Sequence, residues 1–266
     1  ELDKWLIDSG IEASEEGWRA EAHLYCVEIR IPEWDGWTIP VCPSWVIAPK
    51  TGTWIELVPI EAEKRFGFRV RTGGNGYANA EDGTKQGADI VCPPSLWEIL
   101  RRNKVHAGTP RSIPYNLLIE NAGGLRAWEK NDFQPRPADV LQERLFCIRW
   151  RKPDWIDDRG RERKGDLVYR EPRSHDVQVE ERVVTALSAV MQEWQAAGWI
   201  PSWRIEPGEK TDEPIRTKGW TYWHQLFTPR QLLMNGRYSQ LIADQPPDVR
   251  AALLLNLGRL ADTNAR

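Results

Sequence analysis

The chain has 266 residues, of which 41% are hydrophobic and 28% charged, a composition typical of a globular protein with an apolar core. The formal net charge of −3 argues against binding nucleic acid through bulk positive charge, although a local basic surface is compatible with it. No apolar run comes near the roughly 18 residues of a membrane helix, and no signal segment opens the chain, so we expect a cytoplasmic protein. Because the first residue is Glu1, we also expect a piece of a longer polypeptide.

The N-terminal half is predicted to be rich in β-structure. Residues 1–18 are typical of a short helical segment. From residue 20 to about 93, short runs of β-branched and aromatic residues are separated by turns, which predicts strands at 23–31, 45–49, 53–60, 66–72 and 88–92. The polar, glycine-rich stretch 71–87 predicts a mobile loop, not a phosphate cradle, because its glycines do not stand between a strand and a helix. A helix over 94–104 follows, with Ser95 as its expected cap.

The second half begins with residues 105–137, which we expect to be partly helical. Residues 144–152 and 165–172 then predict a strand pair around the charged loop 153–164. Apolar residues at helical spacing from 177 to 194, followed by Gly198, predict a long helix. A polar connector over 200–219 leads to a helix opened by Thr228 and a last helix from about Asp248.

These elements predict an α+β fold with a β-rich N-terminal half, a small second sheet and a helical C-terminal part. We expect three consecutive segments, at residues 1–104, 105–204 and 205–266. The four cysteines are widely spaced, without a C-x-x-C pair, so we expect reduced and mostly buried thiols. The 15 tryptophans are expected to be mainly large buried anchors.

The stretch FTPRQ, residues 227–231, has the sequence of a well-made helix start. Thr228 can cap the helix, Pro229 suits the first helical position, and Gln231 can return a hydrogen bond to the cap. Phe227 and Leu232 can pack together on either side of that turn. Structure alone therefore explains these residues, and a function for them needs a separate argument.

Few residues stand in patterns that carry chemistry. The four histidines do not have metal-ligand spacing, and we find no nucleophile–base pair that would indicate a hydrolase. His224 lies beside Trp223 and either orients a substrate or bonds to a backbone carbonyl. Residues 144–173 hold ten Lys and Arg against six Asp and Glu. If strands present them on one face, four of these residues form a DNA-binding surface, and the alternative is a solvated hairpin: Arg149, Arg151, Lys152 and Arg170.

The sequence GWTYWHQLFTPRQLL resembles a motif of large adenine-specific DNA methylases that carry a zinc-ribbon-like insertion and belong to bacterial phage-defence gene neighbourhoods. Further pieces with the same order as in that family are AHLYCVEI, GWTIPVCPSWVIAPK, RLFCIRW, VYREP, EWQAAGWIP and GRLADTNAR. The resemblance covers residues 20–266, and FTPRQLL is its most specific part.

The resemblance implies an S-adenosylmethionine-dependent methyltransferase in which this chain is the region between the cofactor motif and the Asp-Pro-Pro-Tyr motif. Neither motif is present, because residues 72–76 (TGGNG) are not the cofactor turn and residues 246–248 are not the Asp-Pro-Pro-Tyr tetrad. The resemblance therefore implies a catalytically incomplete piece that needs the remaining core. It also implies that Phe227, Thr228 and Pro229 line one wall of the cofactor pocket in the intact enzyme. Pure architecture is the other explanation for these three residues.

The zinc positions of that family are degenerate here. The first cysteine pair corresponds to Ile31 and Asp35, and the second to Cys92 and Ser95. One thiolate cannot replace the four ligands of a structural zinc site, so we expect no tightly bound zinc and a compensating contribution from packing. A different class of function is a non-catalytic module that docks other proteins of a defence system, which the acidic balance and abundant tryptophan favour over DNA contact.

Overall fold

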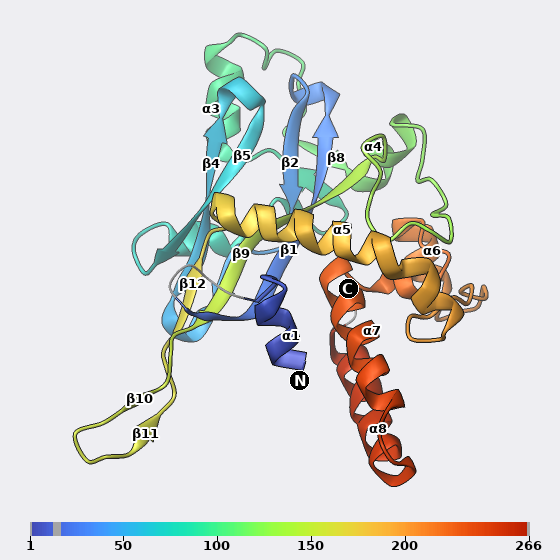
Figure 1. Ribbon diagram of the computed structural model, residues 1–266. Helices are drawn as coiled ribbons and strands as arrows, with labels where there is room; N and C mark the ends of the chain where they lie inside the picture. The colour runs from blue at the N-terminus through green and yellow to red at the C-terminus, as the bar shows by residue number, and fades with distance from the viewer. Residues whose placement is uncertain (1, 13–16, 265–266) are drawn as a thin grey trace. The chain divides into compact units, whose positions relative to one another are not determined.

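A computed structural model describes residues 2–12 and 17–264 of the chain (Figure 1). Its contacts divide the chain into two compact units that are each assembled from separate stretches. The first unit comprises residues 1–15, 126–135 and 173–266, and the second comprises residues 16–125 and 136–172. The three consecutive segments expected from the sequence have different borders, because contacts between distant stretches define each unit.

The second unit contains the strands. Within the described residues its main sheet has seven strands in the order β12-β9-β1-β2-β5-β4-β3. These are β1 (Arg19–Ile31), β2 (Trp37–Val41), β3 (Val46–Ala48), β4 (Thr53–Ile60), β5 (Arg65–Thr72), β9 (Leu141–Arg151) and β12 (Leu167–Arg170). Neighbouring strands are antiparallel except β2 and β5, which join in parallel at Thr38 and Arg65.

Smaller elements complete the second unit. A three-stranded sheet comprises β6 (Lys85–Gln86), β7 (Asp89–Val91) and β8 (Ser112–Pro114), and a hairpin comprises β10 (Trp155–Ile156) and β11 (Glu162–Arg163). The helices are α2 (Tyr77–Glu81), α3 (Pro94–Arg102) and α4 (Tyr115–Asn121), with short 3₁₀ turns η1 (Pro32–Trp34), η2 (Pro49–Thr51) and η3 (Glu61–Glu63).

Two apolar clusters hold the second unit together. In the larger one, β1, β2 and β5 pack against the small sheet and the helices α3 and α4, with Trp34 and Phe66 fully buried. In the other, the rings of Trp45, Phe68 and Phe146 contact one another at centroid distances of 5.6–5.9 Å. Tryptophans therefore act as core anchors here, as the sequence predicted.

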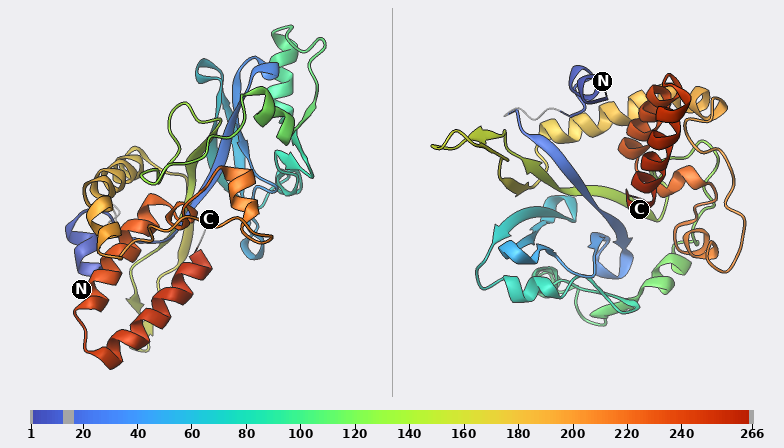
Figure 2. Two further views of the ribbon diagram at one scale, coloured as in Figure 1. Left: turned by 90° about the vertical axis from the view of Figure 1, so that its right-hand side faces the viewer. Right: turned by 90° about the horizontal axis from the view of Figure 1, so that it is seen from below.

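The first unit is helical. Its elements are α1 (Leu2–Asp8), α5 (Ser174–Ala196), α6 (Asp212–Lys218), η4 (Trp223–Leu226), α7 (Pro229–Ala243) and α8 (Pro247–Asn264). The long helix α5 begins where Asp176 accepts a hydrogen bond from the N–H of Arg173, at 2.7 Å, and Gly198, at φ +79°, follows its end. Apolar residues of α1, α5 and α7 form the core of this unit, and α7 and α8 form a helical hairpin (Figure 2).

The fold is α+β, with the β-rich N-terminal half and the helical C-terminal part that the sequence predicted. The predicted strand pair forms as β9 and β12, but it belongs to the main sheet, because the 13-residue strand β1 pairs with β9 along most of its length. Across the described residues, no helix has both the length and the hydropathy that are needed to cross a lipid bilayer.

Several local predictions were wrong. Ser95 does not cap α3: Pro93 is the N-cap residue and Pro94 fills the first turn, without a side-chain cap bond. The predicted loop 71–87 contains α2 and β6, because Ala80 is drawn into the core and the backbone of Gly83 lies against Cys42. The predicted loop 153–164 contains β10 and β11, and the predicted connector contains α6. Strand β2, which contains Pro40, was not predicted from the sequence.

Candidate functional site

The segment from Gly219 to Gln231 joins α6 to α7 and is unusually rich in buried polar side chains. Gly219 ends α6 at φ +75°, in the left-handed region that favours glycine. The 3₁₀ turn η4 follows, and within it His224 and Gln225 are both fully buried. Buried polar groups need hydrogen-bond partners, so the partners of these two residues show which parts of the unit the segment is attached to.

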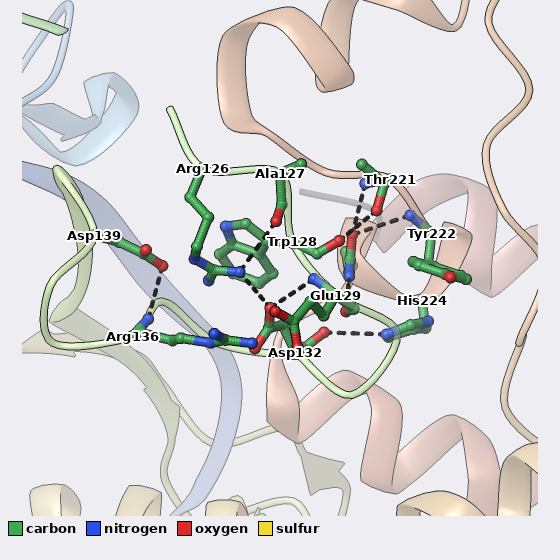
Figure 3. Close-up of polar contacts among 11 residues, drawn as sticks. Arg126, Ala127, Trp128, Glu129, Asp132, Arg136, Asp139, Thr221, Tyr222 and His224 are labelled. Atoms are coloured by element: carbon green, nitrogen blue, oxygen red, sulfur yellow. Dashed lines mark hydrogen bonds and ion pairs between the residues drawn. The ribbon is translucent and has the colours of Figure 1, made fainter. Parts of the chain in front are cut away.

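Gln225 closes the turn and ties it to a distant stretch of the same unit. Its side-chain oxygen accepts hydrogen bonds from the backbone N–H groups of Thr221 and Tyr222, at 2.7 and 3.0 Å. Its side-chain nitrogen donates to the carbonyl of Glu129 at 2.7 Å. The hydroxyl of Thr221 donates to the carbonyl of Trp128, which lies in the same distant stretch (Figure 3). Residues 126–135 are thereby attached to the turn before α7.

His224 makes a second attachment to that stretch. Its Nε2 lies 3.1 Å from the backbone oxygen of Asp132 (Figure 3). Its Nδ1 lies 3.5 Å from the side-chain nitrogen of Gln195 on α5. A carbonyl only accepts, so the proton is assigned to Nε2 and Nδ1 accepts from Gln195. The geometry therefore matches the backbone-bonding alternative for His224, in which the ring serves the architecture.

Asp132 organises the other side of this network. Its Oδ2 accepts from Nη1 of Arg126 at 2.5 Å and from the backbone N–H of Glu129 at 2.7 Å. The guanidinium of Arg126 also lies over the ring of Trp128, with 6.0 Å to the ring centroid. This stretch has no regular secondary structure of its own, so its shape depends on these side-chain bonds.

The predicted capping box at the start of α7 is confirmed. Thr228 Oγ1 accepts from the N–H of Gln231 at 3.3 Å, and the Gln231 side chain accepts from the N–H of Thr228 at 2.8 Å. Pro229 occupies the first helical position. Phe227 and Leu232 belong to one apolar cluster, as the predicted packing across the cap requires.

Arg230 is the residue of this motif whose role the sequence did not indicate. It is buried, and its Nη2 and Nε donate to Oε1 of Glu180 on α5, at 2.6 and 3.1 Å. Its Nη1 donates to the carbonyl of Ile11 at 2.9 Å and lies 3.4 Å from Glu12. A buried arginine that satisfies two segments fixes the start of α7 against α5 and the stretch after α1.

A cavity of about 490 Å³ lies beside this helix start, within the first unit. It is bounded by the turn after α5, one face of α7, and α8. Its lining is mainly apolar and aromatic, and Asn235, Ser239 and Arg250 supply its polar groups. The other lining residues are Gly198, Trp199, Ile200, Pro201, Trp203, Phe227, Leu232, Ile242, Ala243, Leu254, Leu257 and Ala261.

The three predicted cofactor-wall residues have different places around this cavity. Phe227 lines it, and a role of this residue in cofactor binding stays a prediction. Thr228 is buried and uses its hydroxyl for the cap, and Pro229 is half-buried at the first turn. Thr228 and Pro229 thus position Phe227 and lie outside the lining.

The four predicted DNA-binding residues do not share a face. Arg149 and Arg151 alternate with Trp150 along β9, so they lie on one face of the sheet, where both pair with Glu21. Arg170 lies opposite Ile148 in the register and therefore occupies the other face, over the rings of Trp18 and Trp150.

Lys152 follows β9 and lies with Arg170 over Trp18, at 5.7 Å from the ring centroid. The alternation of β-strands thus divides the four residues between two faces, so the condition under which they form one DNA-binding surface is not met. A DNA-binding role for each side chain stays a prediction.

The four positions that the motif resemblance assigned to a zinc site also lie in unsuitable places. Ile31 is fully buried at the end of β1, and Asp35 pairs with Lys64 at 3.0 Å. Cys92 is buried after β7, and Ser95 lies in the first turn of α3. In the part of the chain that the structure describes, no group of three or more His, Cys, Asp or Glu side chains is gathered as a metal site requires. The absence of tightly bound zinc stays a prediction.

The comparisons with known proteins identify no relative. No family model, no curated protein and no solved structure matches this chain.

Proposed function

We propose that this chain is the insertion and DNA-engaging region of an S-adenosylmethionine-dependent, adenine-specific DNA methyltransferase that acts in the cytoplasm in phage defence or restriction–modification. The motif resemblance of residues 20–266 motivates the proposal. The observation that carries it is the place of Phe227, directly before the cap of α7 and in the lining of the cavity. On this proposal the chain is catalytically incomplete by itself and works with the remaining methyltransferase core.

The cavity has the size and lining of a small-molecule site. Its volume of about 490 Å³ lies within the roughly 300–1,000 Å³ that such sites occupy. Trp199 and Phe227 offer ring surfaces for a planar base, and Asn235 and Ser239 offer polar groups at its edge. Arg250 is also part of the lining, and its positive charge disfavours a nearby sulfonium. The fit is therefore to the adenine end of the methyl donor, and the sulfonium end is assigned to the remaining core.

On this proposal the role of the chain's own residues is to hold the cofactor-facing wall in a fixed position. The methyl donor, when bound, supplies an electrophilic methyl group for the adenine amine. Thr228, Gln231 and Arg230 hold the start of α7 in one place, so that Phe227 presents a fixed wall to the ligand. Such rigid positioning is the part of catalysis that a wall residue can supply, because orientation lowers the entropic barrier to transfer.

The test uses the product of the complete reading frame that encodes this chain. We expect it to transfer tritium-labelled methyl groups from S-adenosylmethionine to adenine in duplex DNA, and the 266-residue chain alone to transfer none. Phe227→Ala should raise the KM for S-adenosylmethionine about tenfold, because a stacking wall is worth about 1–3 kcal/mol. Leu255→Ala, at an exposed position outside the cavity lining, is the matched control. The proposal fails if the complete product transfers no methyl group to adenine.

A second function is favoured by a specific observation. Trp203 and Leu254 are 78% and 50% exposed and both line the cavity, so they form an apolar patch at the surface. Such patches are typical of surfaces that bind other proteins. We propose as the alternative a non-catalytic docking module of a defence system. A gel-shift assay with duplex DNA, run beside a pull-down with the products of neighbouring genes, separates the two: the module binds a partner protein and leaves DNA unshifted.

A further inference from the structure

The β10–β11 hairpin extends beyond the sheet of its own unit, from the ends of β9 and β12 (Figure 1). Trp155 pairs with Arg163 and Ile156 pairs with Glu162. A two-stranded ribbon without a core is marginally stable, so it needs other interactions to keep one shape. The polar contacts of this hairpin supply them at its base and at its turn.

The base of the hairpin is closed by one backbone–backbone hydrogen bond and one hydrogen bond to a side chain. The N–H of Lys152 donates to the carbonyl of Asp166 at 3.0 Å, and Asp154 Oδ1 accepts from the N–H of Gly165 at 2.9 Å. A Cβ atom at Gly165 would lie 1.9 Å from the oxygen of Lys152, so only glycine allows this approach. The hairpin therefore leaves the sheet in a defined direction.

The turn is organised by one carboxylate. Asp157 Oδ1 accepts from the backbone N–H groups of Arg159 and Arg161, at 3.0 and 2.9 Å, and Gly160 adopts φ +71°. The N–H of Arg161, followed by the Arg163 side chain and the N–H of Arg159, lowers the pKa of Asp157. The carboxylate is thus ionised at neutral pH and keeps its acceptor role there.

The same carboxylate orients two arginine side chains. Asp157 Oδ2 accepts from Nε of Arg161 at 3.1 Å and from Nε of Arg163 at 2.9 Å. Strand alternation and the register place Trp155, Asp157 and Arg163 on one face of the hairpin. Nη1 and Nη2 of Arg163 have no partner among the described residues, so this guanidinium has four N–H donors available for an outside ligand.

The two large apolar side chains of the hairpin are also exposed to solvent. Trp155 is 54% exposed and Ile156 is 73% exposed. On the Trp155 face Arg161 and Arg163 stand against Asp157 alone, so this face carries an excess positive charge that suits a polyanion. At the turn, the exposed side chains of Arg159 and Asp158 offset each other. A two-stranded ribbon also fits the width of the major groove. The planar guanidinium of an oriented arginine can donate two parallel hydrogen bonds to phosphate oxygens.

We propose that the β10–β11 hairpin grips the backbone of duplex DNA, with Arg161 and Arg163 each contacting a phosphate and Trp155 packing against the adjacent sugar or base edge. Asp157 is a positioning residue, since it acts through the two arginines. This inference rests on the proposed DNA function. It places the DNA contact on the β10–β11 hairpin, whereas the residues predicted from the sequence lie in or next to β9 and β12.

The experiment measures binding of the 266-residue chain to a fluorescent duplex by anisotropy across a salt series. The double variant Arg161→Ala/Arg163→Ala should bind about tenfold more weakly, and the slope of log affinity against log salt should fall by about 1.8, because each phosphate contact contributes about 0.9. Asp157→Ala should also weaken binding although both arginines remain. Arg101→Ala/Arg102→Ala, at exposed positions on α3, should bind as the unchanged chain does.

The outcomes separate this inference from the proposed function. If the unchanged chain binds duplex DNA and the double variant binds equally well, with circular dichroism that shows a retained fold, the hairpin assignment is overturned and the methyltransferase proposal stands. If the complete reading-frame product neither binds duplex DNA nor methylates it, both fail. A double variant that instead loses a partner protein in a pull-down, with DNA binding unchanged, also overturns the hairpin assignment.

Discussion

Thr228 shows how much of the motif's chemistry is local. Its hydroxyl and its backbone N–H both bond to Gln231, and the two residues need only the correct spacing to do so. Arg230, between them, has the opposite character: its partners lie 50 and about 219 positions away, on α5 and after α1. One five-residue stretch therefore combines a bond pattern set by sequence with one set by the fold.

Replacing Thr228 tests the cap. Thr228→Ala should lower the free energy of unfolding by about 1 kcal/mol, because the N–H of Gln231 loses its acceptor in a partly buried place. Thr228→Ser should retain most of that stability. Denaturant unfolding followed by tryptophan fluorescence measures both. Thr263→Ala, at an exposed position of α8, is the matched control, and an equal loss in both alanine variants would contradict a capping role.

At the scale of elements, α7 and α8 are joined by a short turn but pack very differently. In α7, Leu232, Leu233 and Ile242 are buried, whereas the residues of α8 whose side chains are described are exposed or half-buried. The apolar face that the sequence predicted for α8 is only partly buried: Leu253 and Leu257 are half-buried and Leu260 is exposed. Because α8 buries few apolar side chains, we expect its local unfolding to have a lower free energy than that of α7.

Two glycines in these helices offer a matched pair of substitutions. A Cβ atom at Gly236 in α7 would lie 2.3 Å from the ring of Trp194, whereas at Gly258 in α8 it would meet nothing within 4 Å. Gly236→Ala should therefore destabilise the protein by about 1–3 kcal/mol, since overpacking outweighs the helix propensity of alanine. Gly258→Ala should stabilise it by up to about 1 kcal/mol. Thermal unfolding by circular dichroism measures the two shifts, and equal signs would refute the packing argument.

At the scale of the whole molecule, the two units differ in their cysteine content. All four cysteines are free thiols of the second unit, and Cys26, Cys92 and Cys147 are buried, as the sequence predicted. Burial raises the pKa of Cys92 and of Cys147 to about 12. Thiol reactivity therefore reports on the second unit alone.

We expect a thiol reagent at pH 8 to modify Cys92 and Cys147 at least about a hundredfold more slowly in the folded protein than in denaturant, because the thiolate is the reactive form and burial suppresses it. The folded pKa values are raised, so this contribution to stability is present below about pH 8.5 and is lost as pH rises toward 12. Unfolding curves at pH 8 and pH 10 measure the loss. Fast modification of both thiols at pH 8 would contradict their burial.

Secondary structure was predictable where one local pattern dominated. The capping box at Thr228, the long helix α5 and the antiparallel pair β9 and β12 all follow from spacing and turn chemistry. Predictions failed where packing overrode a local preference. Gly83 and Ala80 lie in a stretch with loop composition, but close backbone approach and core contact order it.

The sequence by itself determined the α+β class, the helix start at Thr228 and the presence of buried thiols, because propensity, capping and hydrophobic spacing act over a few residues. Only the tertiary structure decided which side chains meet. It placed Phe227 in a cavity with residues of α8, buried Arg230 against Glu180, and divided the predicted basic residues between two faces. Those outcomes depend on contacts between stretches far apart in the chain, which local spacing does not encode.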